Sequence, residues 1–214
     1  MKKIIISLLL ALGLATSSYA VSLEGLSVGV AGSHAGFYAV GTENTDNDPT
    51  GVDDTSEAGA FTANHVSIFA EYSLGPISIG LDYIPQQIET PKNTNIQGAI
   101  TNTVKGEFEN HTTLYGLIPL PLGGLYLKAG VVYVDLISVE TLNTGGKYGD
   151  TDTTGAMGGI GYSIEAADGV NIRAEVTAVE YDGVSMSNSA DGTKSVSLSD
   201  MMSAFGTISI VKSF

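Results

Sequence analysis

Polar and apolar residues alternate along most of this chain, and a period of two is typical of β-strands with one apolar face. Between residues 66 and 74, for example, every even-numbered position is apolar or aromatic, and the odd-numbered positions include Ser67, Glu71 and Ser73. The pattern predicts an all-β fold with eight strands, at residues 24–41, 59–74, 77–85, 105–118, 125–139, 154–165, 170–181 and 202–214.

The connections between these segments alternate in length. Short connections fall at residues 75–76, 119–124 and 166–169, and long ones at 42–57, 86–104, 140–153 and 182–200. An even number of strands, with short turns at one end and long loops at the other, is typical of a bacterial outer-membrane barrel. We therefore expect an antiparallel up-and-down transmembrane β-barrel with short periplasmic turns, four longer extracellular loops and both termini on the periplasmic side.

The first twenty residues have the pattern of a cleaved secretory signal peptide. Lys2 and Lys3 precede an apolar run from Ile4 to Ala15, and small residues stand at Ser18 and Ala20. The run is shorter than the roughly 20 residues of a spanning helix. We expect residues 1–20 to be removed and residues 21–214 to form one barrel domain.

A soluble periplasmic barrel that binds a hydrophobic ligand would show the same alternation, with its apolar face turned inward. Two observations favour the membrane. Charges of both signs occur in the middle of the polar faces, where a narrow lumen lets them pair. Four tyrosines also lie near the ends of the apolar faces, where an interfacial girdle is expected: Tyr72, Tyr83, Tyr133 and Tyr162.

The charge is strongly acidic and unevenly distributed. The chain has 23 acidic and 9 basic residues, a formal charge of −14 and no cysteine. This composition argues against nucleic-acid binding and excludes disulfides and cysteine-zinc sites. The four long connections hold 13 of the acids and three lysines. We therefore expect a negative outer surface.

The chain ends in an amphipathic segment in which Ile208, Ile210 and Phe214 share one face. A last strand ending in phenylalanine resembles the assembly signal of bacterial outer-membrane barrels. The whole mature chain resembles the eight-stranded OmpA-transmembrane-domain, OmpX and OmpW type. This resemblance implies insertion of a monomer by the outer-membrane assembly machinery, contact with outer-membrane lipids and lipopolysaccharide, and a non-enzymatic role in membrane integrity or surface interaction, with limited solute permeation at most.

The polar faces predict a charged network inside the barrel. Its expected members are His65, Glu71, Asp82, Glu109, His111, Lys128, Arg173 and Glu175. They could line a narrow polar path or gate. The structural interpretation is favoured, because eight strands enclose little more than their own side chains, and enclosed charges must be paired.

A lipid-modifying hydrolase is the enzymatic alternative. His65-Val66-Ser67 looks like the His-x-Ser element of a barrel-embedded lipid A deacylase, but no Asn follows Ser67. Both side chains are also expected to face the lumen, about 7 Å apart along the strand. We favour ordinary lumen-filling roles and predict no catalytic residues.

The first long connection approaches the spacing of a calcium loop, with Asp46, Asp48, Gly51 and Glu57 at its key positions. No helices flank it, so a solvated acidic loop is the preferred interpretation, with no metal or cofactor. In the first strand, we expect a bulge near Gly32 that turns His34 into the lumen.

Overall fold

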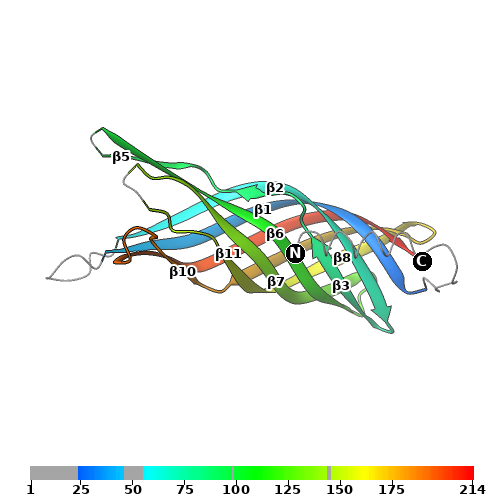
Figure 1. Cartoon of the computed structure of the whole chain (residues 1–214). Helices are drawn as coiled ribbons and strands as arrows, with labels where there is room; N and C mark the ends of the chain where they lie inside the picture. The colour runs from blue at the N-terminus through cyan, green and yellow to red at the C-terminus, as the bar shows by residue number, and fades with distance from the viewer. Residues whose placement is uncertain (1–23, 46–54, 98, 144–145) are drawn as a thin grey trace, which may run out of the picture.

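The computed structural model describes residues 24–45, 55–97, 99–143 and 146–214. They form one antiparallel sheet that closes on itself, because β1 pairs with β2 on one side and with β11 on the other. Figure 1 shows the resulting elongated barrel. Eight strands make the ring: β1 (Leu26–Thr45), β2 (Thr55–Leu74), β3 (Ile77–Tyr83), β6 (Ile100–Pro119), β7 (Leu125–Thr141), β8 (Thr151–Ala167), β9 (Val170–Tyr181) and β11 (Lys194–Ser213).

The predicted all-β barrel is confirmed, and its strands continue into segments expected as loops. β1 and β11 each have 20 residues, about twice the 9–11 that a tilted strand needs to cross a membrane. Three short strands, β4 (Ile88–Glu89), β5 (Asn93–Gln97) and β10 (Val184–Ser187), extend the hairpins further. The outer half of the molecule is therefore largely β-structure. The signal-peptide prediction and the calcium-loop positions Asp46, Asp48 and Gly51 lie outside the described residues.

An apolar belt surrounds the end of the barrel that carries the short turns. On β9, for example, Ile172 and Val176 point outward and are 46% and 63% exposed. Glu175 and Thr177, which have the opposite parity on this strand, are buried inside the barrel. The outward face becomes polar at Glu180, ten residues above the start of this strand. A band of this height suits the hydrocarbon layer of an outer membrane.

No helix in the described part of the chain is long and apolar enough to span a membrane.

The expected bulge near Gly32 is wrong. β1 stays in continuous register with β2 over its described length, and the shift against β11 falls between Tyr38 and Val40. His34 therefore points outward, where its Nδ1 lies 2.7 Å from Oδ1 of Asn64. On β2 the outward residues become polar or small from Asn64 on, whereas on β1 the ring of Tyr38 is still exposed further out, so the pair lies near the outer edge of the apolar belt, where polar groups are tolerated. Ala35 and Phe37 instead face inward and are buried.

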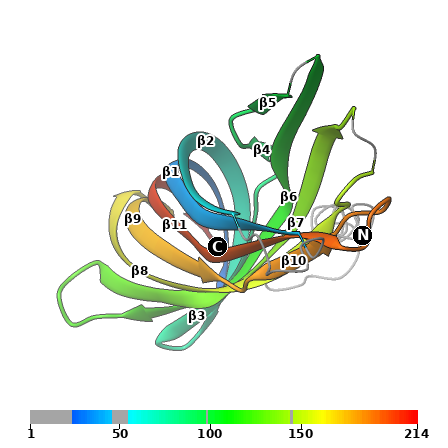
Figure 2. The ribbon, with the colours of Figure 1, turned by 90° about the vertical axis from the view of Figure 1, so that its left-hand side faces the viewer.

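The barrel wall is interrupted between β2 and β3. Their ladder ends at Ile68 and Tyr83, and β3 stops before Pro85. The side-chain carbonyl of Gln86 then accepts the backbone N–H of Val66 at 2.7 Å, in place of a strand neighbour. Above this point β4 and β5 pair with β6 and diverge from β2, as Figure 2 shows.

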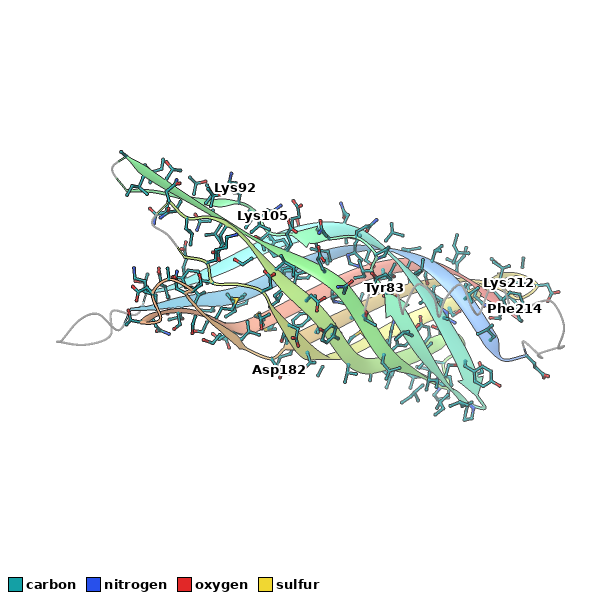
Figure 3. The ribbon with its side chains drawn as sticks, viewed as in Figure 1. Tyr83, Lys92, Lys105, Asp182, Lys212 and Phe214 are labelled. Carbon is teal, nitrogen blue, oxygen red and sulfur yellow. The ribbon has the colours of Figure 1, made fainter. Side chains whose placement is uncertain are left out.

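The hairpin of β5 and β6 carries an ion-pair cluster. Lys105 lies 2.8 Å from Glu107 and 3.0 Å from Glu89, and its hydrogen bonds to these carboxylates raise the pKa of the lysine. Figure 3 places Lys105 and Lys92 at the end of the molecule opposite Phe214. Exposed pairs of this kind contribute little stability, so the hairpin depends mainly on its backbone ladder.

The C-terminus closes the ring at the short-turn end. The N–H of Phe214 donates to Leu26 O at 2.9 Å, and Gly25 N–H donates to Phe214 O at 3.2 Å. Lys212 reaches Asp168 O at 3.1 Å, so its charge extends toward the short turn rather than into the belt. Phe214 is 53% exposed, which leaves its ring accessible. Its role as an assembly signal stays a prediction.

We predict that Val176→Arg costs about 2–4 kcal/mol of unfolding free energy in lipid vesicles, because it places a charge in the hydrocarbon layer. Val104→Arg is the matched control, since Val104 is also exposed but lies on the outer extension of β6. It should change the free energy by less than about 0.5 kcal/mol, as surface substitutions usually do. Reversible urea unfolding measures both, and equal costs would contradict the position of the belt.

Candidate functional site

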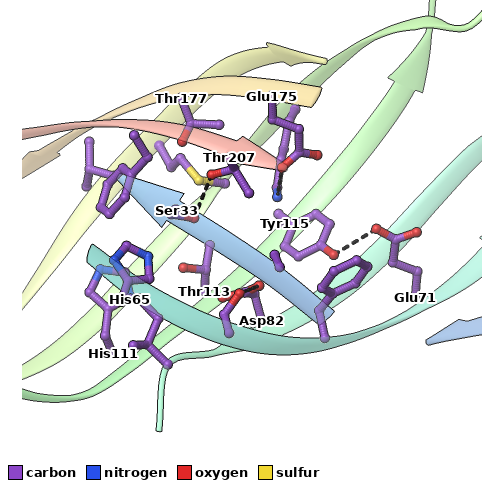
Figure 4. A pocket seen from close by; sticks show the side chains of 18 residues that line it. Ser33, His65, Glu71, Asp82, His111, Thr113, Tyr115, Glu175, Thr177 and Thr207 are labelled. Atoms are coloured by element: carbon purple, nitrogen blue, oxygen red, sulfur yellow. Dashed lines mark hydrogen bonds and ion pairs between the residues drawn. The ribbon is translucent and has the colours of Figure 1, made fainter. Parts of the chain in front are cut away.

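A small cavity lies inside the barrel where the polar faces of all eight ring strands converge. Its volume is about 50 Å³, enough for a few water molecules and too small for a solute. Figure 4 shows the charged, hydroxyl and imidazole groups that line it. We call the charged groups at one end of this lining, together with the two side chains that bond to them, the ion-pair layer. It consists of Glu71, Tyr115, Lys128 and Glu175, which line the cavity, and of Tyr126 and Arg173.

The ion-pair layer has two halves, each built around one glutamate, and Glu71 accepts the hydrogen bonds of the first half. Its Oε1 accepts from Arg173 Nη1 at 2.6 Å and from the Tyr115 hydroxyl at 2.8 Å. The three residues belong to β2, β9 and β6, so the contacts cross the lumen rather than follow one strand. Both charged side chains are largely buried, at 12% and 4% exposure. Charge-assisted hydrogen bonds offset the cost of their burial.

Glu175 repeats the arrangement in the second half. It accepts from the Tyr126 hydroxyl at 2.7 Å and from Lys128 Nζ at 2.9 Å. Arg173 and Glu175 are neighbours on the inner face of β9, so positive and negative groups alternate across the lumen. The two halves also touch, because Lys128 Nζ lies 4.2 Å from the centre of the Tyr115 ring.

Two glycines make room for the tyrosines. A Cβ atom on Gly80 would lie 2.4 Å from Cζ of Tyr115, and one on Gly161 would lie 2.3 Å from Cζ of Tyr126. Each ring therefore lies flat against a strand where no side chain stands. This packing lets two large rings and four charged groups fill one level of an eight-stranded lumen.

A second, apolar layer fills the lumen on the outer side of the cavity. Phe37 stacks on Phe61 with ring centres 4.9 Å apart, and it also contacts Phe108 at 5.6 Å and Phe205 at 5.8 Å. These residues come from β1, β2, β6 and β11. The layer is completed by buried aliphatic residues: Ala35, Ile84, Ile88, Val132, Val134, Leu136, Val179 and Met201. Phe61 and Phe108 pack together at the level where the ladder between β2 and β3 is missing.

His65 and Ser67 do not form a nucleophile and base. The Ser67 hydroxyl donates to Asp82 Oδ2 at 2.8 Å, and His65 Nδ1 has no hydrogen-bond partner among the described residues. Both side chains are buried inside the lumen, at 6% and 3% exposure. A lipid held outside the barrel cannot reach Ser67.

His111 lies between the two layers. Its Nε2 is 3.2 Å from the Tyr181 hydroxyl, which lies 3.0 Å from Ser203 Oγ. The ring also packs against Phe205, as the ring of His65 does. The two histidines therefore separate the ion-pair layer from the apolar layer.

The structure brings six of the eight predicted network residues to one cavity, pairs the seventh, Arg173, with Glu71 beside it, and places Glu109 elsewhere. Glu109 lies on the outer part of β6, is partly exposed, and accepts a hydrogen bond from Gln87. The register shift in β6 after Glu109 changes which residues face inward, and alternation alone does not reveal such a shift. No group of three or more metal-binding side chains occurs in the described part of the chain.

Tyr115 and Tyr126, which donate to the two central carboxylates, are not among the residues predicted from the sequence. A signal for them was present. Tyr126 has the same strand parity as Lys128, and Tyr115 the same parity as His111, so both belong on the polar inner face rather than among the girdle tyrosines.

Comparison with known proteins identifies the architecture. No family model matches the chain, and no curated relative is found. The outer-membrane protein OprG from Pseudomonas aeruginosa is 13% identical, with 89% of this chain and 97% of OprG covered and a TM-score of 0.54. The fold is that of an outer-membrane β-barrel.

Two other outer-membrane proteins are similar at lower TM-scores. The outer-membrane protease OmpT from Escherichia coli is 8% identical over 94% of this chain and all of its own, with a TM-score of 0.47. Neisserial surface protein A is 10% identical over 89% of this chain and 98% of its own, with a TM-score of 0.43. The likeness to OprG shows the fold, and the exterior apolar belt is the surface that a barrel crossing a membrane presents to lipid.

Removing one partner of a buried ion pair should cost far more than removing both. We expect Arg173→Met to lower the unfolding free energy by about 3–5 kcal/mol, because Glu71 is left charged and buried. The double variant Glu71→Met/Arg173→Met should recover most of this loss. Urea unfolding in vesicles measures the series, and additive losses would contradict a coupled pair.

Proposed function

We infer that this chain is a non-enzymatic outer-membrane barrel that is closed to ions along its axis and presents an acidic, β-structured surface outside the membrane. Its role is envelope integrity and surface contact. It acts as a monomer in a layer of lipopolysaccharide after insertion by the outer-membrane assembly machinery. The observation that carries the proposal is the double closure of the lumen.

The two layers block different solutes. The charges of the ion-pair layer are matched within it, and the cavity beside them holds only a few waters. The apolar layer excludes ions because its side chains offer no hydrogen bonds. A solute moving along the axis meets both barriers.

The non-enzymatic proposal is supported by the environment of the one candidate nucleophile. Ser67 donates to a carboxylate and lies inside the lumen, away from lipid. In the lipid A deacylase-like arrangement, the serine would instead donate to His65 and face the lipid. Mass spectrometry of lipid A from cells with and without the protein tests this directly, and loss of an acyl chain would overturn it.

We expect the refolded wild-type protein to show no steady conductance in a planar bilayer. Variants that open one layer, Lys128→Ala/Arg173→Ala or Phe37→Ala/Phe205→Ala, should also be silent, because the other layer stays closed. The variant that carries all four substitutions should conduct. Its conductance would show that the absence of current through the other proteins is not caused by failed insertion into the bilayer. Steady conductance of the wild type would contradict the proposal.

The interruption between β2 and β3 favours a second candidate function, the sideways passage of small apolar molecules between the outside and the membrane. Buried Ile84 and Ile88 and the rings of Phe61 and Phe108 line the lumen beside this interruption.

Uptake of a small radiolabelled hydrocarbon by cells producing the protein tests this second function. It should exceed the uptake of vector-only cells, and Phe61→Ala/Phe108→Ala should change its rate. Phe69→Ala is the control, because Phe69 packs lower in the lumen with Ala31 and Val211. Equal uptake by producing and vector-only cells would remove this function.

A further inference from the structure

The interruption of the wall leaves one long strand edge without a neighbour. β2 pairs with β1 from Thr55 to Tyr72, but it pairs with β3 only from Ile68 to Leu74. No strand pairs with residues 55–64 on the β3 side in the described part of the chain, although β4 comes near β2. We call this stretch the free edge of β2.

The direction of the exposed backbone groups follows from the ladder. In an antiparallel sheet, residues of one parity direct their N–H and C=O groups to the same neighbour. Val66 directs its N–H to the β3 side, where Gln86 accepts it. Residues 56, 58, 60, 62 and 64 share this parity, so their donors and acceptors point out of the free edge.

The free edge lacks the features that normally protect such edges. Natural edge strands carry lysine, proline or a bulge that prevents pairing with another chain. Residues 55–64 contain no lysine or proline, stay in unbroken register with β1, and include the small exposed residues Ala58, Gly59 and Ala60. The opposite rim is protected, because Pro85, Pro91 and Lys92 lie along it.

The free edge begins at the outer rim of the apolar belt, where the exposed ring of Tyr38 on β1 lies opposite Ala60, and extends beyond it. Asn64, at its lower end, bonds His34 at the outer limit of the apolar belt, and residues 55–60 are exposed above it. An extended peptide in the outer medium can therefore reach it without entering lipid.

The acidic residues around the free edge indicate the charge of a peptide that would bind there. Glu57 on β2 and Glu43 on β1 are exposed beside the edge, and the four outer segments together hold 13 acids and three lysines. Lys105 on β6 is already paired with two carboxylates. The negative potential of these carboxylates favours the binding of a cationic ligand, whereas it repels a second copy of this acidic chain.

We propose that the free edge of β2 binds an extended cationic peptide by strand addition. The peptide pairs with the backbone of residues 56–64 and places its basic side chains over the acidic outer hairpins. This deepens the surface-contact part of the proposed function and is independent of whether the lumen conducts. Failure of the conductance prediction would therefore leave this proposal standing.

The test uses a dye-labelled peptide of alternating lysine and valine and the full refolded protein in nanodiscs of zwitterionic lipid. Fluorescence anisotropy should show saturable binding. Ala58→Pro/Ala60→Pro removes two edge donors, so it should weaken binding by about tenfold or more. Ala58→Val/Ala60→Val keeps both donors and should bind as the wild type does.

A peptide of the same sequence with every backbone nitrogen methylated separates strand addition from charge attraction. It should bind at least about tenfold more weakly, because it cannot donate to β2. Equal affinity of the methylated peptide, or of the proline variant, would overturn the proposal. Absence of saturable binding by the wild type would overturn it as well.

Hydrogen exchange on the wild type keeps the proposal testable if the proline variant does not fold. The peptide should slow exchange at the amides of Ala58, Ala60 and Thr62, which point out of the edge. The amides of Gly59 and Phe61 face β1 and should already be protected. Unchanged exchange at the three edge amides, or a peptide-independent dimer that protects them, would contradict binding of a peptide at this edge.

Discussion

The closure of the sheet between β1 and β11 is the contact on which the rest of the structure depends. Lipid offers no hydrogen bonds, so a chain that crosses it with strands must pair every backbone group within its own sheet. The two strands pair from Ser27 to Thr45, with one shift between Tyr38 and Val40. Near the outer edge of the apolar belt, water can again bond the backbone, so complete pairing is no longer required. The ladder between β2 and β3 stops close to this level, at Ile68 and Tyr83.

Closure in turn decides what the interior holds. A strand that faces lipid with one side must turn its other side inward, so within the apolar belt the lumen receives the polar residues of the alternating pattern. Eight strands leave little space, and the charges are stable because Glu71 and Glu175 each meet a base and a tyrosine. The flat tyrosine rings fit because Gly80 and Gly161 carry no side chain. Closure and charge pairing therefore follow from the same geometry.

Much of this arrangement could be predicted from the sequence, because alternation is a local property. The parity of β2, β3 and β9 places Glu71, Asp82 and Glu175 inside without any tertiary information. The expected bulge near Gly32 was wrong because an apolar inner residue such as Phe37 was not anticipated. Glu109 was misplaced because a register shift in β6 depends on pairing with β7. Neither the apolar layer nor the free edge can be predicted from alternation, since both depend on where neighbouring strands diverge.

The most direct test of the whole account is the accessibility of spin labels placed one at a time along β9 of the protein in lipid vesicles. Labels at the even positions from 172 to 178 should collide readily with oxygen dissolved in the bilayer, and labels at the odd positions from 171 to 177 should be shielded inside the lumen. The opposite parity would mean that the apolar face turns inward, as in a soluble barrel. That result would contradict a membrane-spanning barrel with a paired interior.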